Sequence, residues 1–229
     1  MSNELSARLY VVATPIGNLG DFSSRGIEIL RSVDLILCED TRYSRTLLSQ
    51  HGITTRLQSC HEHNEKGRAS QIVGLLEGGA KVALISDSGT PTISDPGFRI
   101  VSACIEAGII VSPVPGANAA IAALSISGMP TDRFTFEGFL PPKGAKRIRR
   151  VEQILLSSCT CVVYESPHRI LKLMKEVAER TPDRDLVVAR ELTKKFEEVL
   201  RGTASQLLKT IESRGGLKGE IVVLIKGVQ

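Results

Sequence analysis

The residues best suited to hold a small ligand lie in one loop, SDSGTPTISDPG, at positions 86–97. It follows the apolar run 82–85, a candidate strand, and it is rich in glycine, proline, aspartate and hydroxyl residues. Connections between a strand and a helix are normally short, so a long and rigid one is more often functional than structural. Its backbone amides and hydroxyls could hold a carboxylate or a sugar. It does not fit a phosphate-binding P-loop, because the Lys-Ser/Thr pair is missing.

Two further loops have a similar composition. The first, TPIGNLGD at 14–21, follows a predicted strand, and Gly17 and Gly20 would let its backbone come close to a ligand. The second, VPGANAA at 114–120, enters a predicted helix with small residues that leave room for a flat ring. An ordinary strand-to-helix turn and a hinge between domains are the alternatives. No GxGxxG follows a strand, so the common dinucleotide fingerprint is absent.

Several ionisable residues could support acid–base chemistry. Glu39 and Asp40 follow the apolar run 35–38, where a carboxylate could face a ligand or cap the helix expected near Thr41. Lys194 would act as a base only if desolvation lowered its pKa. The full set of candidates is Glu39, Asp40, His61, Glu165, Glu191 and Lys194.

The segment CHEH at 60–63 raises the question of a metal site. On an extended segment, His61 and His63 would point the same way and could bind zinc. No further ligand is evident, so we expect a hydrogen-bonded or substrate-facing role and no metal.

The only strong basic cluster spans residues 143–150 and contains Lys143, Lys146, Arg147, Arg149 and Arg150 but no acid. The chain carries a formal net charge of +4, and without this segment its balance would be slightly negative. Basicity is therefore local, which favours contact with phosphate groups. The alternative is a solvated start of a helix.

The apolar pattern predicts an α/β fold with two domains, 1–114 and 115–229. Buried strands at 9–13, 35–38, 82–85 and 109–111 alternate with helices and predict a mostly parallel N-terminal sheet. One helix is expected from Asn64 to Gly78, and another after Pro96 with Phe98, Val101 and Ile105 on one stripe. Later strands at 134–136, 160–164, 186–189, 196–200 and 221–225 outnumber the helices expected at Ser166-Pro167 and Thr203, which favours a mixed C-terminal sheet.

Composition narrows the class of protein. No run of eighteen apolar residues exists, so no membrane span is predicted. Residues 1–8 are polar and do not resemble a signal peptide. The odd number of cysteines, without CxxC spacing, argues for a reducing compartment, and we expect a cytoplasmic protein.

Nine segments in order resemble the tetrapyrrole methylase superfamily, and within it the branch that methylates ribosomal RNA. They are VATPIGNL (12–19), EDTR (39–42), HEHNE (61–65), residues 86–97, PG (115–116), FEGFLP (136–141), YESPHR (164–169), ARELTK (189–194) and KGE (218–220). Each segment is weak evidence, but nine in the right order are specific.

The resemblance implies two α/β domains, S-adenosylmethionine in the cleft between them, and a homodimer. It also implies 2'-O-methylation of a cytidine ribose in 16S rRNA of the small ribosomal subunit. The implied cofactor contacts are Pro15, Ile16, Gly89, Thr90, Pro91, Ile93, Asn118, Ala119, Tyr164, Glu165 and Ala189. The alternatives are a methylase acting on a corrin or sirohaem precursor and a ribosome assembly factor without enzymatic activity.

Overall fold

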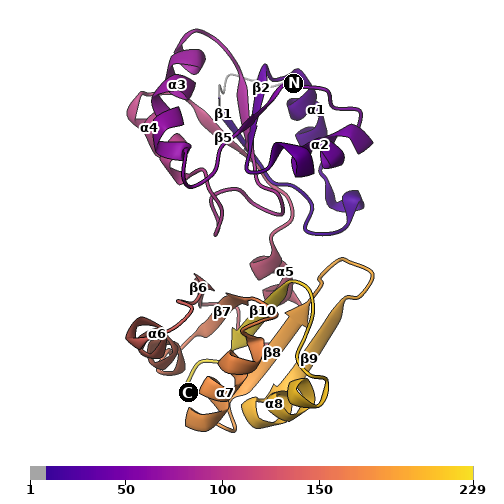
Figure 1. Cartoon of the computed structure of the whole chain (residues 1–229), viewed down its shortest axis with the longest axis vertical. Helices are drawn as coiled ribbons and strands as arrows, with labels where there is room; N and C mark the ends of the chain where they lie inside the picture. The colour runs from indigo at the N-terminus through magenta and orange to yellow at the C-terminus, as the bar shows by residue number, and fades with distance from the viewer. Residues whose placement is uncertain (1–8, 229) are drawn as a thin grey trace. The chain divides into compact units, whose positions relative to one another are not determined.

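The computed structural model describes residues 9–228, so the expectation about a signal peptide at residues 1–8 lies outside the described residues. The chain divides into two compact units, Met1–Asn118 and Ala119–Gln229 (Figure 1). No helix formed by residues 9–228 is long and apolar enough to cross a membrane.

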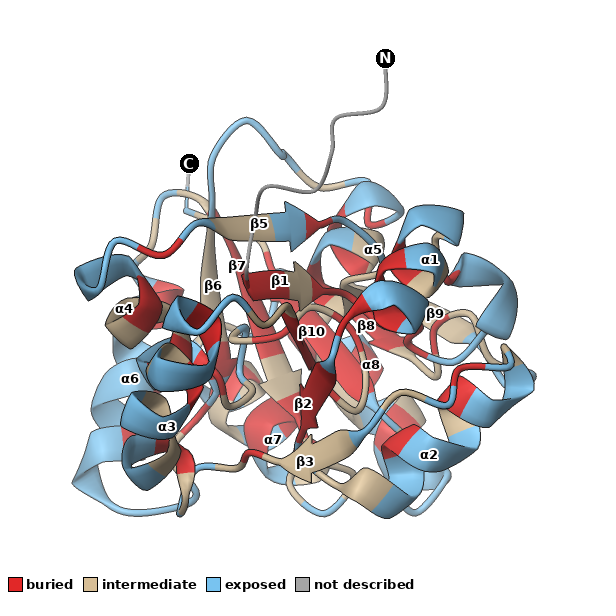
Figure 2. Ribbon diagram, turned by 90° about the horizontal axis from the view of Figure 1, so that it is seen from above, coloured by how far each residue is buried: buried red, intermediate tan, exposed pale blue. Residues whose placement is uncertain are grey.

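The first unit contains a five-stranded sheet in the order β3-β2-β4-β1-β5. All its pairings are parallel, as the sequence predicts. The strands are β1 (Leu9–Val12), β2 (Leu35–Cys38), β3 (Leu57–Ser59), β4 (Val82–Ile85) and β5 (Val111–Val114). Every residue of β2 and β4 is buried, and β2 is red along its length in Figure 2. Such burial is expected of a parallel sheet that is covered on both faces.

Helices cover both faces of this sheet. The helices are η1 (Leu19–Asp21), α1 (Ser24–Ser32), α2 (Thr41–Gln50), α3 (Glu65–Glu77) and α4 (Phe98–Glu106). One hydrophobic cluster includes Ile29 of α1 and Leu48 of α2, and the other includes Ile72 of α3 and Ile100 of α4. Because the strands are parallel and covered on both sides, the loops at their carboxyl ends gather along a single edge of the sheet.

Two expectations about this unit were met only in part. The strand predicted at 109–111 is β5, which runs from Val111 and includes Pro113. Proline is tolerated there because β5 is an edge strand, so a backbone amide on its outer side has no neighbouring strand to bond to. On α4 the predicted stripe packs only in part: Val101 contacts the core, whereas Phe98 is 70% exposed and Ile105 62% exposed.

The second unit has a mixed sheet in the order β6-β7-β10-β8-β9, which confirms the expected class. Only the β6–β7 pairing is parallel. Its strands are β6 (Phe134–Phe139), β7 (Thr160–Glu165), β8 (Asp185–Arg190), β9 (Glu198–Thr203) and β10 (Ile221–Ile225). Its helices are α5 (Ala119–Ser125), α6 (Ala145–Leu155), α7 (Ile170–Arg180) and α8 (Ala204–Ser213).

One face of the mixed sheet packs against α6, α7 and α8, and α5 contacts β7 and β10 (Figure 1). The predicted capping box between Thr203 and Gln206 begins α8, as expected. The predicted start of α7 at Ser166-Pro167 was wrong, because the helix begins at Ile170. A turn precedes it, in which the Ser166 carbonyl accepts hydrogen bonds from the amides of Arg169 and Ile170.

Candidate functional site

Two of the three ligand-type loops are joined directly. The Thr14 amide donates to the Gly89 carbonyl at 2.9 Å, and the Gly89 amide donates back to the Thr14 carbonyl at 3.2 Å. The Thr14 hydroxyl also donates to the Ser86 carbonyl at 3.1 Å. Thr14 is buried, so these bonds are shielded from water. The loops after β1 and β4 therefore form one rigid structure.

The third loop joins the other two. The Thr90 hydroxyl donates to the Ala117 carbonyl at 3.1 Å. A Cβ on Gly116 would lie 2.9 Å from the Cβ of Ala13, so only glycine permits this approach. The loops after β1, β4 and β5 thus meet at the carboxyl edge of the parallel sheet, where α/β folds bind ligands.

The loop 86–97 has an unusual backbone. Gly89 has a φ of +87°, and Thr92 and Ser94 have φ values of 72° and 63° although they are not glycine. Left-handed backbone at residues with a Cβ costs energy and persists only where the surroundings impose it, often at ligand sites. A Cβ on Gly89 would lie 3.3 Å from Ile16 Cγ2, so the backbone at Gly89 forms a close-fitting cradle against the first loop.

Glu65 fixes the far end of this loop, a role that the sequence did not reveal. Its buried carboxylate accepts hydrogen bonds from the amides of Gly97 at 3.1 Å and Arg99 at 2.6 Å. These amides belong to the first turn of α4, which lacks a side-chain cap of its own. Glu65 therefore satisfies free helix amides and holds the loop end in place.

Carboxylates gather where β2 and β4 end. The Asp40 amide lies 3.4 Å from Asp87 Oδ1. Partial desolvation raises the pKa of Glu39 above its usual value, and the charge of Asp87 raises it further, against an opposing effect of His61. Burial also raises the pKa of Asp87. Sequence reasoning missed Asp87, because loop 86–97 was interpreted mainly through its backbone and hydroxyl groups. Perturbed carboxylates of this kind are frequent at catalytic sites.

Asp40 is the N-cap of α2, the alternative that the sequence left open. Its carboxylate accepts a hydrogen bond from the Arg42 amide at 2.8 Å and pairs with the Arg42 guanidinium at 3.0 Å. These bonds from Arg42 lower the pKa of Asp40 to about 2. So acidic a carboxyl is a weak base near neutral pH, and we withdraw Asp40 as a base candidate.

His61 lies just after β3, on the same edge of the sheet. Its Nε2 is 3.0 Å from the Asn64 side-chain amide, and its backbone amide donates to Asn64 Oδ1 at 2.9 Å. Its Nδ1 is buried and has no hydrogen-bond partner in the described part of the chain. The rings of His61 and His63 are 6.0 Å apart. Within residues 9–228, no group of three or more His, Cys, Asp or Glu side chains could hold a metal ion.

In the second unit, Tyr164 links β7 to the start of α5. Its hydroxyl accepts a hydrogen bond from the Ala120 amide at 3.1 Å, next to Ala119. Its ring contacts those of Phe136 and Phe139, with centroids 5.0 and 5.6 Å apart. Ala189 of β8 is fully buried. Of the cofactor contacts expected in this unit, Ala119 and Tyr164 are therefore neighbours.

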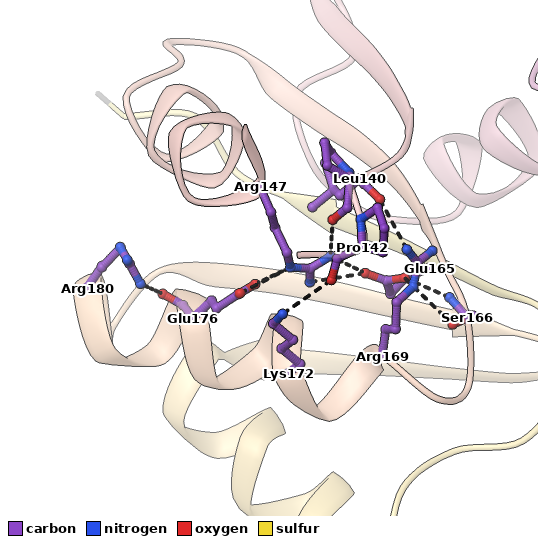
Figure 3. A network of polar contacts seen from close by, with 10 residues as sticks. Leu140, Pro142, Arg147, Glu165, Ser166, Arg169, Lys172, Glu176 and Arg180 are labelled. Atoms are coloured by element: carbon purple, nitrogen blue, oxygen red, sulfur yellow. Dashed lines mark hydrogen bonds and ion pairs between the residues drawn. The ribbon is translucent and has the colours of Figure 1, made fainter. Parts of the chain in front are cut away.

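Arg147 and Glu165 form the centre of a buried ion-pair network (Figure 3). Arg147 is 1% exposed, and its guanidinium pairs with Glu165 at 3.2 Å and with Glu176 at 2.8 Å. Glu165 also pairs with Arg169 at 2.8 Å and accepts a hydrogen bond from the Ser166 amide. Two expectations need correction as a result. Arg147 is not available to contact phosphate, and the Glu165 carboxylate is not available to a cofactor.

The other residues of the basic cluster have different surroundings. Lys143, Lys146, Arg149 and Arg150 are all exposed. Arg150 pairs with Glu137 at 2.8 Å, whereas Lys146 and Arg149 form no ion pair with any residue in the range 9–228. This part of the cluster remains suited to bind an anion.

Lys194 is unsuited to act as a base. Its ammonium pairs with Glu191 at 3.2 Å and with Glu220 at 3.1 Å. Burial lowers the pKa of Lys194, but the charge and hydrogen bonds of Glu220 and Glu191 raise it more, so the net shift is upward. The desolvation effect on which the expectation depended is thus outweighed, and the group stays a cation.

Comparisons with known proteins identify the family and the fold of the chain. A family model described as Tetrapyrrole (Corrin/Porphyrin) Methylases matches residues 8–208. The chain is 49% identical to ribosomal RNA small subunit methyltransferase I of Xylella fastidiosa, over 96% of this chain and 81% of that one. It is 45% identical to the protein of that name from Escherichia coli O157:H7, over 96% and 78%. A solved cobalt precorrin-4 methyltransferase, 19% identical, shares the fold with a TM-score of 0.65 over 95% of this chain and 94% of that one.

Proposed function

Because the chain belongs to the tetrapyrrole methylase family, we propose that it transfers the methyl group of S-adenosylmethionine to a cytidine 2'-hydroxyl in 16S rRNA of the small ribosomal subunit. The observation that carries the proposal is the near full-length identity of 45–49% to relatives named for the small-subunit RNA. A ribosomal substrate is found in the cytoplasm, and we propose that location and a homodimeric state for this chain.

The joined loops of the first unit have the properties that a methyl donor site needs. The cradle at Gly89 would be filled by any side chain, and Ile16, Pro15 and Pro91 are buried beside it. Backbone amides and the hydroxyl of Thr90 would bind the polar parts of the donor, while Ile16 would contact its apolar parts. Ile93 and Asn118 complete the proposed contacts of this unit. Ala119, Tyr164 and the backbone of Ala189 are the proposed contacts of the second unit.

Methyl transfer from S-adenosylmethionine to a ribose hydroxyl requires the protein to activate the hydroxyl. S-adenosylmethionine supplies a methyl group on a sulfonium, which is already activated. A ribose hydroxyl is a poor nucleophile at neutral pH, so a group that accepts its proton accelerates the transfer. Glu39 fits this role, because its pKa is raised and its carboxylate lies in the cluster with Asp87 and His61. We therefore assign the base to Glu39, with Asp87 as the neighbour that raises its pKa.

Transfer of a labelled methyl group tests the function. We expect label in small ribosomal subunits, and digestion to nucleosides should place it on the 2'-oxygen of cytidine. Naked 16S rRNA and a tetrapyrrole precursor are the parallel acceptors. Label in the tetrapyrrole alone would identify a small-molecule methylase. Binding of S-adenosylmethionine without transfer to any acceptor would instead support an assembly factor without enzymatic activity.

Gly89→Ala tests the donor site. The added Cβ would press on Ile16, and the φ of +87° would be strained, so the cradle should shift. We expect S-adenosylhomocysteine, the product form of the donor, to bind about tenfold more weakly, a loss of about 1.4 kcal/mol. Isothermal titration calorimetry measures this change.

Gly108→Ala is the matched control. It has a similar φ of +70°, but a Cβ there meets nothing within 4 Å. Both variants should lose some stability to backbone strain, and only Gly89→Ala should lose affinity. Equal affinities in the two variants would remove Gly89 from the donor site.

A further inference from the structure

A hollow of about 320 Å³ lies beside the edge strand β6 and is not explained by the donor site. It is lined by Glu137, Phe139, Leu140 and Pro141, together with Lys146, Arg149, Arg150 and Gln153 of α6. Its volume is at the lower end of the range for small-molecule sites, about 300–1,000 Å³. All of its lining residues belong to the second unit.

A β-bulge places Phe139 at this hollow. The register between β6 and β7 shifts between Phe136 and Gly138, so Glu137 is the extra residue. Side chains alternate between faces along a regular strand, and residues three apart point to opposite faces. Here the bulge puts Phe136 and Phe139 on the same face, where both rings contact Tyr164. Phe139 nevertheless stays 55% exposed, which leaves most of its side chain available to a ligand.

One face of α6 supplies the charge. Lys146, Arg149, Arg150 and Gln153 follow the spacing i, i+3, i+4 and i+7, which places them on one side of a helix. Arg147, Val151 and Ile154 are buried on the other side, and the ion pairs of Arg147 fix the rotation of the helix. Lys146 and Arg149, which form no ion pair with any residue of the described range, therefore both line the hollow.

An exposed aromatic ring, two available cations and a side-chain amide around a small hollow match the chemistry of one unpaired nucleotide. Bases stack on aromatic side chains, phosphates bind to Lys and Arg, and an amide can pair with a base edge. An RNA duplex would not enter so small a space, because its bases are stacked and paired. The carboxylate of Glu137, which also lines the hollow, is paired with Arg150 at 2.8 Å, so its charge is largely offset.

We propose that this hollow binds an unpaired nucleotide of the RNA substrate, next to the nucleotide that is methylated. The inference rests on the proposed function and adds a subsite to it. Phe139 contacts Tyr164, a proposed contact of the methyl donor, so a base stacked on Phe139 would lie close to the reacting nucleotide. The hollow would then hold the strand open while the ribose reacts.

The test uses the full chain and a short single-stranded RNA that contains 2-aminopurine, whose fluorescence is quenched when it stacks. Wild type should quench the probe, and Phe139→Leu should weaken binding roughly 5- to 150-fold, the range found when one stacking contact is lost. Lys146→Ala with Arg149→Ala should reduce the slope of log affinity against log salt by about 1.4, or about 0.7 for each phosphate contact.

Matched controls separate the hollow from general effects. Phe134→Leu changes a ring on the same strand outside the hollow, and Lys209→Ala removes an exposed charge on α8. Both should bind the probe as wild type does. Unchanged donor binding and melting temperature in Phe139→Leu would show that the fold is intact.

Three results would overturn the subsite: no quenching by wild type, equal affinity of Phe139→Leu and wild type, or equal affinity of wild type for the matching duplex. Methyl transfer to small subunits by a wild type that fails this test would leave the proposed function standing. The opposite outcome is also possible: Phe139→Leu loses probe binding, but wild type transfers no methyl group to any RNA. That outcome would support a nucleotide site in the hollow and reject the proposed function.

Discussion

Replacing Glu39 by glutamine is expected to lower kcat for methyl transfer about 10²–10⁴-fold, the usual contribution of general acid–base catalysis. Glutamine keeps the size of the side chain and cannot accept the proton of the ribose hydroxyl. Binding of the donor should change little, because Glu39 is not among the proposed contacts of the donor. Single-turnover transfer to small subunits, with the donor saturating, measures the rate of the chemical step without interference from product release.

The same variant should be more stable than wild type at neutral pH. The pKa of Glu39 is raised in the folded state, which means that the ionised carboxylate is less stable in the folded chain than in the unfolded chain. The carboxyl group is therefore neutral and without this cost below its unfolded pKa. Its ionisation destabilises the fold progressively between the unfolded and the folded pKa, and the full cost is present above the folded pKa. Glutamine does not ionise, so Glu39→Gln avoids this cost. The melting temperatures of wild type and Glu39→Gln should be similar in acid, and that of Glu39→Gln should be higher near pH 7. Lower activity together with higher stability would distinguish a functional residue from a structural one.

The pH dependence of transfer follows from the same shift. The base must be ionised, so wild-type kcat should fall as pH drops through the raised pKa of Glu39, at a higher pH than for an ordinary glutamate. Asp87→Asn removes a charge that raises this pKa and should move the fall to lower pH. Asp40→Asn, which changes a helix cap, is the control for the base assignment and should keep most of kcat. Wild-type kcat in Glu39→Gln would contradict the assignment and leave positioning alone as the source of the rate.

The sequence predicted the strands best where they are buried from end to end. Strands β2, β4 and β10 occur at the predicted residues, because a strand covered on both faces must be apolar throughout. Strand β5 was misplaced because proline normally excludes a strand, and its edge position is a property of the whole sheet. On helix α4 the apolar stripe did not distinguish Val101, which packs against the core, from Phe98 and Ile105, which are apolar yet exposed.

The candidate site was likewise predictable only where local sequence determines its features. The composition of the three loops indicated a ligand site, whereas their mutual contacts join residues more than seventy positions apart, such as Thr14 and Gly89. No local pattern encodes such contacts. Arg147 could have been separated from its basic neighbours, because it shares its helix face with Val151 and Ile154. Its acidic partners, Glu165 and Glu176, come from distant segments and could not be identified from spacing.

Replacing Arg147 by methionine is expected to lower the free energy of unfolding by about 3–5 kcal/mol, the usual cost of removing one partner of a buried ion pair. For a chain of this size that corresponds to a fall in melting temperature of roughly 6–20 °C. Methionine fills much of the space, so most of the loss would come from Glu165, whose side chain has no solvent exposure. Glu165 would keep only Arg169 as an ion-pair partner, besides its hydrogen bond from the Ser166 amide. Thermal and urea unfolding measure the change.

Arg149→Met is the matched control, since this exposed arginine lies two residues further along the same helix and should change stability by no more than about 0.5 kcal/mol. Adding Glu165→Gln to Arg147→Met should recover part of the loss, because no unpaired charge is then buried. Equal losses in the Arg147 and Arg149 variants would show that the network does not stabilise the fold.

The Arg147 network also determines how α6 presents its cations. Its guanidinium donates to Glu165, Glu176 and the Pro141 carbonyl, and so ties the helix both to α7 and to the segment that follows β6. Arg147→Lys keeps the charge but cannot reach all three acceptors at once, because an ammonium lacks the spread of a guanidinium. In that variant, binding of single-stranded RNA should weaken at temperatures where the chain is still folded, although no RNA-contacting residue has changed. An Arg147→Lys variant that binds RNA as wild type does would show that α6 holds its orientation without the network.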